Sequence, residues 1–208
     1  MRVLAHIARV RNLVLVTALC SVPASAYADW LFSPFLGGTF AGKTALLDLE
    51  QGAGSTQVVF GGSAGWWGAG VLGVEADFGY VPRFFKRDNA AGLVADSNVA
   101  TFGLDVVVAT PVSVTRESLR PYLVGGLGWM HASIDESLNL FPELFGRARN
   151  SVGMNVGGGA IGFITPRAGV RFELRQFRSL ERDENPFTGE RVALLSFWRA
   201  TVGVVIRR

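Results

Sequence analysis

Apolar and polar residues alternate with a period of two in several stretches of this sequence. In residues 167–175, Arg, Gly and Glu occupy the odd positions, and Ala, Val, Phe and Leu occupy the even positions. A period of two predicts a β-strand with one charged face and one apolar face. Glycine is frequent inside these stretches, and because it is a poor helix former it also favours strands.

Eight stretches of this kind follow one another along the chain. The predicted strands are residues 30–40, 57–66, 71–81, 99–110, 121–132, 151–164, 167–175 and 196–206. The connections between them run long, short, long, medium, long, short, long. The first short connection is predicted as a tight turn, Trp67-Gly68-Ala69-Gly70. Short periplasmic turns and long outer loops are typical of outer-membrane barrels. The pattern therefore predicts an all-β protein, an eight-stranded antiparallel up-and-down transmembrane β-barrel with both ends on the periplasmic side.

The first 28 residues have the features of a secretory signal. Arg2, Arg9 and Arg11 precede a short apolar run, and small residues end at Ala28, after which we expect cleavage. Residues 29–208 then form one barrel domain. Although 49% of the chain is hydrophobic, no apolar run beyond the signal approaches the roughly 20 residues of a spanning helix.

The charge balance and the cysteine content exclude several classes of function. The chain has 20 Lys+Arg and 17 Asp+Glu, and three of the Arg lie in the signal, so residues 29–208 are formally neutral. This balance does not favour a nucleic-acid partner. Cys20 is the only cysteine and lies in the signal, so we expect neither a disulfide nor a metal–thiolate site. We expect no metal and no cofactor.

Four segments resemble a known family. These are Gly37-Gly38-Thr39-Phe40, Pro121-Tyr122-Leu123-Val124-Gly125-Gly126-Leu127-Gly128, residues 169–175 and residues 197–204. Together with the signal, they resemble small eight-stranded outer-membrane β-barrels of the outer-membrane protein A type. The resemblance implies a bacterial outer-membrane location, insertion by the barrel assembly machinery, contact with membrane lipid and lipopolysaccharide, and a monomer.

The charged faces of the strands predict an ionic network in the lumen. The residues expected there are Glu75, Asp77, Asp105, Arg171, Glu173, Arg175 and Arg199. The interior of an eight-stranded barrel is about wide enough for side chains alone, so these charges have to pair. We interpret the network as a structural filling of the lumen. A narrow ion path gated by the Arg–carboxylate pairs is the alternative.

Aromatic residues and basic loops complete the set of candidate sites. Rings near strand ends predict girdles at the two membrane interfaces, formed by Trp30, Trp66, Tyr80, Tyr122, Trp129, Phe163 and Trp198. Long connections carry basic residues that we expect to face outward, where they could meet lipopolysaccharide phosphates: Arg83, Lys86, Arg87, Arg147 and Arg149.

Two further functional classes stay open at this point. A soluble, lipocalin-like ligand-binding barrel would turn the apolar faces inward and the charged faces outward. A lipid-modifying enzyme is suggested by His131 and Ser133, a His-x-Ser pair that resembles the lipid A 3-O-deacylase barrel. That family continues with Asn where this chain has Ile134, and no well-placed orienting acid is evident. The reading that we favour is a non-enzymatic barrel that contributes to envelope structure or surface-loop interaction.

Overall fold

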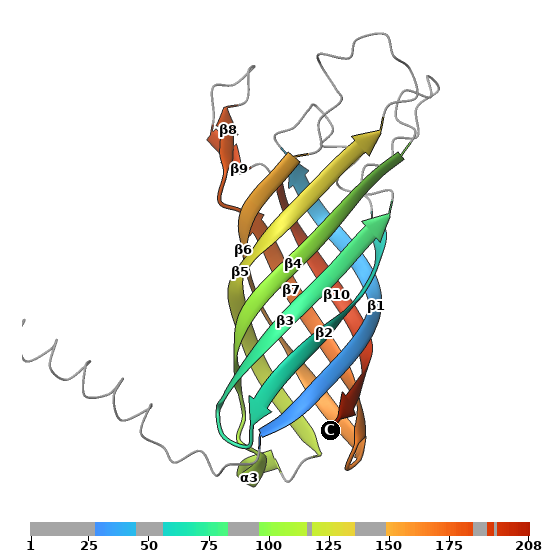
Figure 1. Cartoon of the computed structure of the whole chain (residues 1–208), viewed down its shortest axis with the longest axis vertical. Coiled ribbons are helices and arrows are strands. Elements are labelled where there is room, and N and C mark those ends of the chain that lie inside the picture. Colours follow the sequence, from blue (N-terminus) through green and yellow to red (C-terminus); the bar gives the residue numbers. More distant parts are fainter. Residues whose placement is uncertain are drawn as a thin grey trace, which may run out of the picture.

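The computed structural model of the protein describes residues 28–44, 56–82, 96–115, 118–135, 149–184, 191–193 and 195–208. Eight long strands form a closed antiparallel barrel in the order β1-β10-β7-β6-β5-β4-β3-β2 (Figure 1). Their bounds are β1 Ala28–Thr44, β2 Gln57–Gly68, β3 Leu72–Pro82, β4 Asp96–Ala109, β5 Leu119–Asp135, β6 Arg149–Thr165, β7 Ala168–Ser179 and β10 Leu195–Arg207. The predicted fold class is confirmed.

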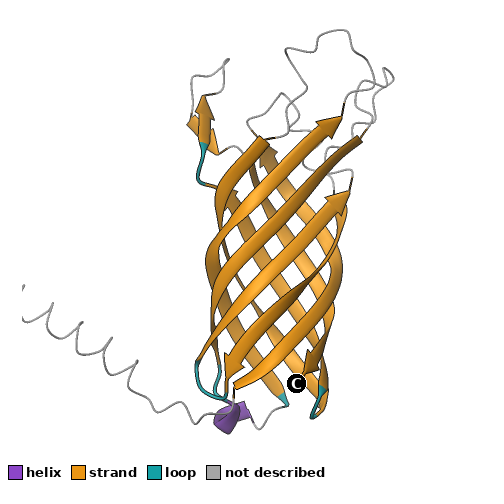
Figure 2. Ribbon diagram, in the orientation of Figure 1, coloured by secondary structure: helices purple, strands orange, loops and turns teal. Residues whose placement is uncertain are grey.

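The structure differs from the sequence prediction in three additional elements and in the end of one strand. A short helix, α3 Val112–Thr115, lies in the connection between β4 and β5, and the strands β8 Arg182–Glu184 and β9 Arg191–Ala193 pair beyond β7 (Figure 2). Strand β2 continues to Gly68, whereas a turn was predicted from Trp67. No helix among the described residues is long and apolar enough to cross a membrane.

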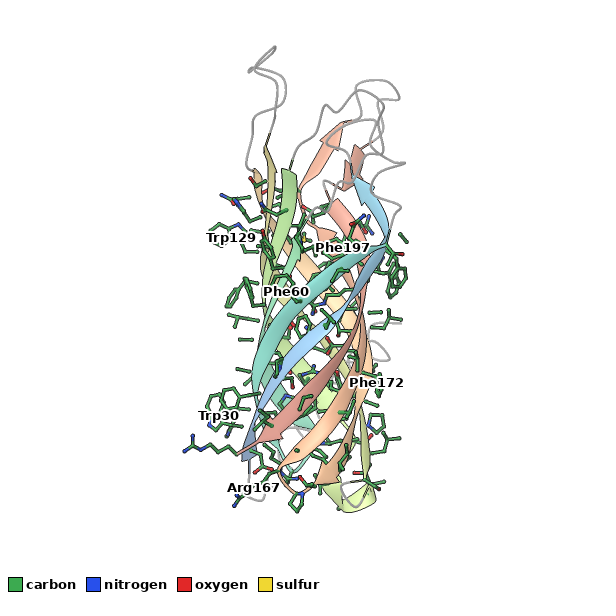
Figure 3. All side chains as sticks on the ribbon, turned by 90° about the vertical axis from the view of Figure 1, so that its right-hand side faces the viewer. Trp30, Phe60, Trp129, Arg167, Phe172 and Phe197 are labelled. Carbon is green, nitrogen blue, oxygen red and sulfur yellow. The ribbon has the colours of Figure 1, made fainter. Side chains whose placement is uncertain are left out.

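The strands expose their apolar side chains and bury their charged ones. On β7, Phe172 is 61% exposed, whereas the neighbouring Arg171 is 5% exposed. Figure 3 shows Phe60 and Phe172 on the outside of the barrel, and Phe197 lies within it, 1% exposed. Outward apolar side chains on every barrel strand suit hydrocarbon. This arrangement is the reverse of the soluble, lipocalin-like alternative.

The two ends of the barrel differ in their connections. At the end with the start of β1 and the end of β10, the turns between β2 and β3 and between β6 and β7 are short (Figure 1). Short turns mark the periplasmic end of an outer-membrane barrel, so the opposite end is the outer one. The proposed signal, residues 1–28, lies outside the described residues except for Ala28, and its cleavage stays a prediction.

Candidate functional site: the ionic layer of the lumen

The structure brings the seven predicted lumen charges together inside the barrel. They come from β3, β4, β7 and β10, and each is at most 7% exposed. The alternation places them inward, because every second residue of a strand points to the same side. Four carboxylates meet three guanidinium groups, and an unpaired charge at this depth would be costly. The structure shows how they are paired.

Arg175 lies at the centre of this ionic layer and is fully buried. Its Nη1 donates to Asp105 Oδ2 at 2.5 Å, its Nη2 donates to Glu75 Oε1 at 2.6 Å, and its Nε donates to Glu173. The planar guanidinium carries five N–H donors in a fixed fork, which allows one side chain to contact several carboxylates at once. Arg175 thus joins strands β3, β4 and β7 through side chains.

Arg171 forms a second centre on the periplasmic side of Arg175. It donates two hydrogen bonds to Glu75, from Nη1 to Oε2 at 2.7 Å and from Nη2 to Oε1 at 2.9 Å. Its Nη2 also contacts Glu173, and its Nη1 donates to Ser63 Oγ at 3.0 Å. A bidentate pair of this kind fixes both side chains in orientation as well as in distance.

Arg199 pairs with Asp77 and is held between two aromatic rings. Its Nη2 donates to both carboxylate oxygens of Asp77, at 2.9 and 2.8 Å. Its guanidinium carbon lies 4.8 Å from the Phe35 ring centre and 4.6 Å from that of Phe177. Cation–π contact compensates part of the burial of this charge. This matters because its Nε and Nη1 have no hydrogen-bond partner.

Tyr122 lies inside the barrel in contact with the ionic layer, and its prediction as a girdle residue is wrong. Its hydroxyl donates to Glu173 Oε2 at 2.7 Å and accepts a hydrogen bond from Arg171 Nε at 2.6 Å. The side chain is only 4% exposed. Tyr122 has an even number, like Gly126 and Gly128, whose positions on β5 face inward. The alternation of the strand therefore predicts the inward face for Tyr122, and this should have outweighed its place near a strand end.

Trp67 was missed because neighbouring glycines suggested a turn. Its ring is 2% exposed and lies between two guanidinium groups, Arg171 at 5.5 Å and Arg120 at 5.6 Å. Arg120 in turn donates to three backbone carbonyls, on Gly68 and Gly70 in the β2–β3 turn and on Thr110 before α3. This arginine therefore ties the periplasmic turns together beneath Trp67.

Phe163 is also misplaced in the predicted girdle. It is half-buried and packs against the apolar residues inside the periplasmic end, with the Arg207 guanidinium 5.3 Å from its ring centre. It shares the odd numbering of Ile161, which is fully buried. The remaining predicted girdle residues face outward: Trp30, Trp66, Tyr80, Trp129 and Trp198.

Glycine makes room for the ionic layer where a side chain approaches the opposite strand. A Cβ on Gly126 would lie 2.2 Å from the Leu104 carbonyl oxygen and 2.3 Å from Asp105 Oδ1. A Cβ on Gly159 would lie 2.5 Å from the Tyr122 hydroxyl. Neither position has space for even one methyl group, so inward glycines and large charged side chains complement each other across the barrel wall.

The neighbouring glycines 125 and 126 provide a matched test of this packing. We expect Gly126→Ala to lower the free energy of unfolding by about 1–3 kcal/mol, because the methyl group overpacks the wall against backbone. Gly125 faces lipid, and the nearest atom to a Cβ added there is 3.5 Å away. Gly125→Ala should therefore leave the free energy of unfolding nearly unchanged. Urea titration of both variants measures the difference, and equal stability would contradict the assigned faces.

Two apolar layers enclose the ionic layer along the barrel axis. The outer layer contains Val59, Val81, Val99, Met130, Ala132, Phe177, Leu195 and Phe197, with Phe35 beside it. The periplasmic layer contains Leu31, Trp67, Val107, Ala109, Tyr122, Val124, Ile161 and Val205, with Phe163 beside it. In the outer layer, the Phe177 and Phe197 rings stack with centres 5.2 Å apart. The seven charged side chains of the ionic layer therefore lie between two groups of packed rings and aliphatic side chains.

The remaining candidate sites are the His131–Ser133 pair, the basic outer connections and a metal site. The His131 ring contacts Asn150 Oδ1 on β6 at 2.5 Å, so its neighbour is an amide rather than the carboxylate that a Ser–His hydrolase uses. Arg83, Lys86, Arg87 and Arg147 lie outside the described residues, and the Arg149 side chain is not described either. Within the described segments, no group of three or more His, Cys, Asp or Glu side chains could hold a metal ion.

Comparison with solved structures places this geometry among small outer-membrane barrels. Neisserial surface protein A has a TM-score of 0.57 at 17% identity, covering 86% of this chain and 96% of that chain. OprG from Pseudomonas aeruginosa has a TM-score of 0.56 at 15% identity, covering 87% of this chain and 96% of that chain. Ail, the attachment invasion locus protein of Yersinia pestis, has a TM-score of 0.54 at 11% identity, covering 87% of this chain and 98% of that chain. These likenesses show a shared fold.

The sequence itself identifies the family. No curated protein sequence matches the chain. The family model of the outer membrane protein beta-barrel domain matches residues 13–205, nearly the whole chain. The closed eight-stranded barrel and its solved neighbours agree with this match. This chain therefore belongs to the outer membrane protein beta-barrel domain family and is located in the bacterial outer membrane.

Proposed function

We propose that this protein is a closed, non-enzymatic outer-membrane barrel that contributes to envelope structure and presents its outer connections for surface interaction. The observation that carries the proposal is the enclosure of the ionic layer between two apolar layers. The ionic layer cross-links four strands, and the apolar layers keep water away from it. The barrel then serves as a rigid support in the membrane rather than as a pore.

The lumen on both sides of the ionic layer is packed with rings and aliphatic side chains, which argues against conduction. A hydrated ion needs polar groups or water along its whole route, and a constriction lined by apolar side chains excludes water. Eight strands enclose an interior that side chains can fill. Here Trp67, Phe177 and Phe197 are all at most 4% exposed, so they fill the lumen on either side of the charges.

Single-channel recording in planar bilayers tests the closure. We expect no discrete conductance for the wild-type protein, Trp67→Ala or Phe197→Ala, because at least one apolar layer stays intact in each. Steps that occur only in the double variant would assign the closure to the apolar layers. Silence of all four proteins would assign it to the ionic layer. Reproducible discrete steps from the wild-type protein would contradict the proposal.

The surface part of the proposal concerns the outer connections. Loops on a rigid scaffold commonly carry recognition, and this barrel is cross-linked from within. Ail, which shares the fold, has been solved in complex with the heparin analogue sucrose octasulfate. In the present chain, the connection between β3 and β4 is basic by sequence, with Arg83, Lys86 and Arg87 against Asp88. An anionic surface partner would fit this connection best.

A further inference from the structure

The described part of the periplasmic end carries more arginine than acidic residues. The described residues there include four arginines but a single acidic residue, Asp29. The arginines are Arg120, Arg167, Arg207 and Arg208. Residues 29–208 contain equal numbers of acidic and basic residues, since the chain has 20 Lys+Arg, three of them in residues 1–28, and 17 Asp+Glu. The excess of positive charge at this end is therefore a property of its location and not of the composition.

Two of these four arginines are engaged in the fold, and two face outward. Arg120 donates to the carbonyls of the periplasmic turns, and Arg207 donates to Asp29 Oδ2 at 2.6 Å. Arg167 and Arg208 are exposed, and neither forms an ion pair with another described residue. Their guanidinium groups are thus available for an anion.

Arg167 and Arg208 both adjoin Arg207 at the periplasmic end of β10. Arg167 lies beside Arg207 on the β7 side, whereas Arg208 follows Arg207 and pairs with β1. The Arg207 amide donates to the Arg167 carbonyl at 2.8 Å, which brings the β6–β7 turn against the end of β10. Arg208 and Trp30 exchange backbone hydrogen bonds of 2.9 and 3.0 Å. Figure 3 shows Trp30 on the outside near the periplasmic end, with Arg167 below it.

The lipid-facing surface of β1 and β10 directly above Arg208 is apolar. Phe32 lies opposite Ile206 in the β1–β10 pairing, and Leu36 lies opposite Val202. Phe32 is 43% exposed and Ile206 is 51% exposed, and the Trp30 and Phe32 rings stack with centres 6.2 Å apart. The periplasmic end of β10, together with the neighbouring ends of β1 and β7, thus presents cations, then an indole, then hydrocarbon-facing side chains. A phospholipid presents phosphate, glycerol and acyl chains in the same order.

We propose that the periplasmic end of β10, with Arg167, Arg208 and Trp30 around it, binds an anionic phospholipid of the inner leaflet. Guanidinium groups bind phosphate oxygens through paired hydrogen bonds, and Trp favours the headgroup level of a membrane. Two exposed arginines attract a lipid with net negative charge and have no such preference for a zwitterionic one. A carboxylate-bearing wall polymer would match the charge, but it would leave the apolar column of Phe32 and Ile206 without a role.

Native mass spectrometry of the folded, detergent-solubilised barrel tests the site, with phosphatidylglycerol and phosphatidylcholine of identical chains as probes. We expect the wild-type protein to retain phosphatidylglycerol in preference. Arg167→Gln combined with Arg208→Gln should reduce that preference about tenfold or more, because each arginine near a membrane surface contributes about 1 kcal/mol. Arg178→Gln is the matched control, because Arg178 is exposed on β7 at the outer end.

The outcomes separate this site from its alternatives. An unchanged preference in the double variant, or an equal loss in the Arg178 control, would overturn the assignment. Loss of phosphatidylglycerol on adding millimolar inorganic phosphate would reassign the arginines to free phosphate. A faster-migrating band of the unboiled double variant on a denaturing gel shows that it has folded. The inference does not depend on a closed lumen, so a conducting barrel would leave it intact.

Discussion

Arg175→Met is expected to destabilise the folded barrel by about 3–5 kcal/mol, since removing one partner of a buried ion network leaves uncompensated charge. Arg175 is fully buried and contacts Asp105, Glu75 and Glu173. Methionine fills a similar volume but offers no donor to the three carboxylates. Urea titration of the barrel in lipid vesicles measures the loss, and the unboiled protein should lose its faster-migrating band at a lower urea concentration.

Two further substitutions identify the cause of this loss. Arg175→Lys keeps the positive charge but replaces the planar fork by a single ammonium, so we expect an intermediate loss of stability. Arg178→Met changes the same residue type on the same strand, but at an exposed position, and should cost little. If Arg175→Met and Arg178→Met were equally stable, the ionic layer would not hold the barrel together.

Leu104→Arg should cost about 2–4 kcal/mol, because a charge on the lipid face is most expensive at the bilayer midplane. Leu104 is 63% exposed and lies at the middle of the outward apolar residues of β4. In water this exposure would make the arginine harmless. The measurement is the free energy of unfolding in lipid vesicles, with Leu104→Ala as the variant that removes the side chain without adding charge.

The same substitution near the membrane interface is the matched control. Leu119 is 57% exposed at the periplasmic start of β5, where an arginine can reach the headgroups. We expect Leu119→Arg to cost about 0–1 kcal/mol. Equal effects at both positions would contradict the assigned depth. Stability unaffected by Leu104→Arg would show that this face does not meet hydrocarbon.

The errors of the sequence analysis have a common physical origin. Tyr122 and Phe163 were assigned to the membrane interface by residue type and by their place near strand ends. The alternation of side chains along β5 and β6 instead places both residues on the lumen side. Trp67 was assigned to a turn because of its glycine neighbours, yet β2 continues through Gly68 and pairs with β1. In each case a local preference was weaker than the face imposed by the strand.

What could be predicted of the ionic layer was its membership, and not its pairing. Glu75 and Arg171 are 96 residues apart, and Asp77 and Arg199 are 122 residues apart. Charge alone is compatible with any acid meeting any arginine. The observed pairs depend on the stagger between strands, which sets the height at which each side chain enters the lumen.

The sequence by itself determined the barrel strands, their number and which side chains of a strand share a face, because alternation is a local property of each strand. The tertiary structure alone decided three features: which charges pair, the two apolar layers on either side of them, and the position of Arg167 and Arg208 around the periplasmic end of β10. Each of these brings together residues from strands distant in the chain, and their relative heights are set only when the barrel closes.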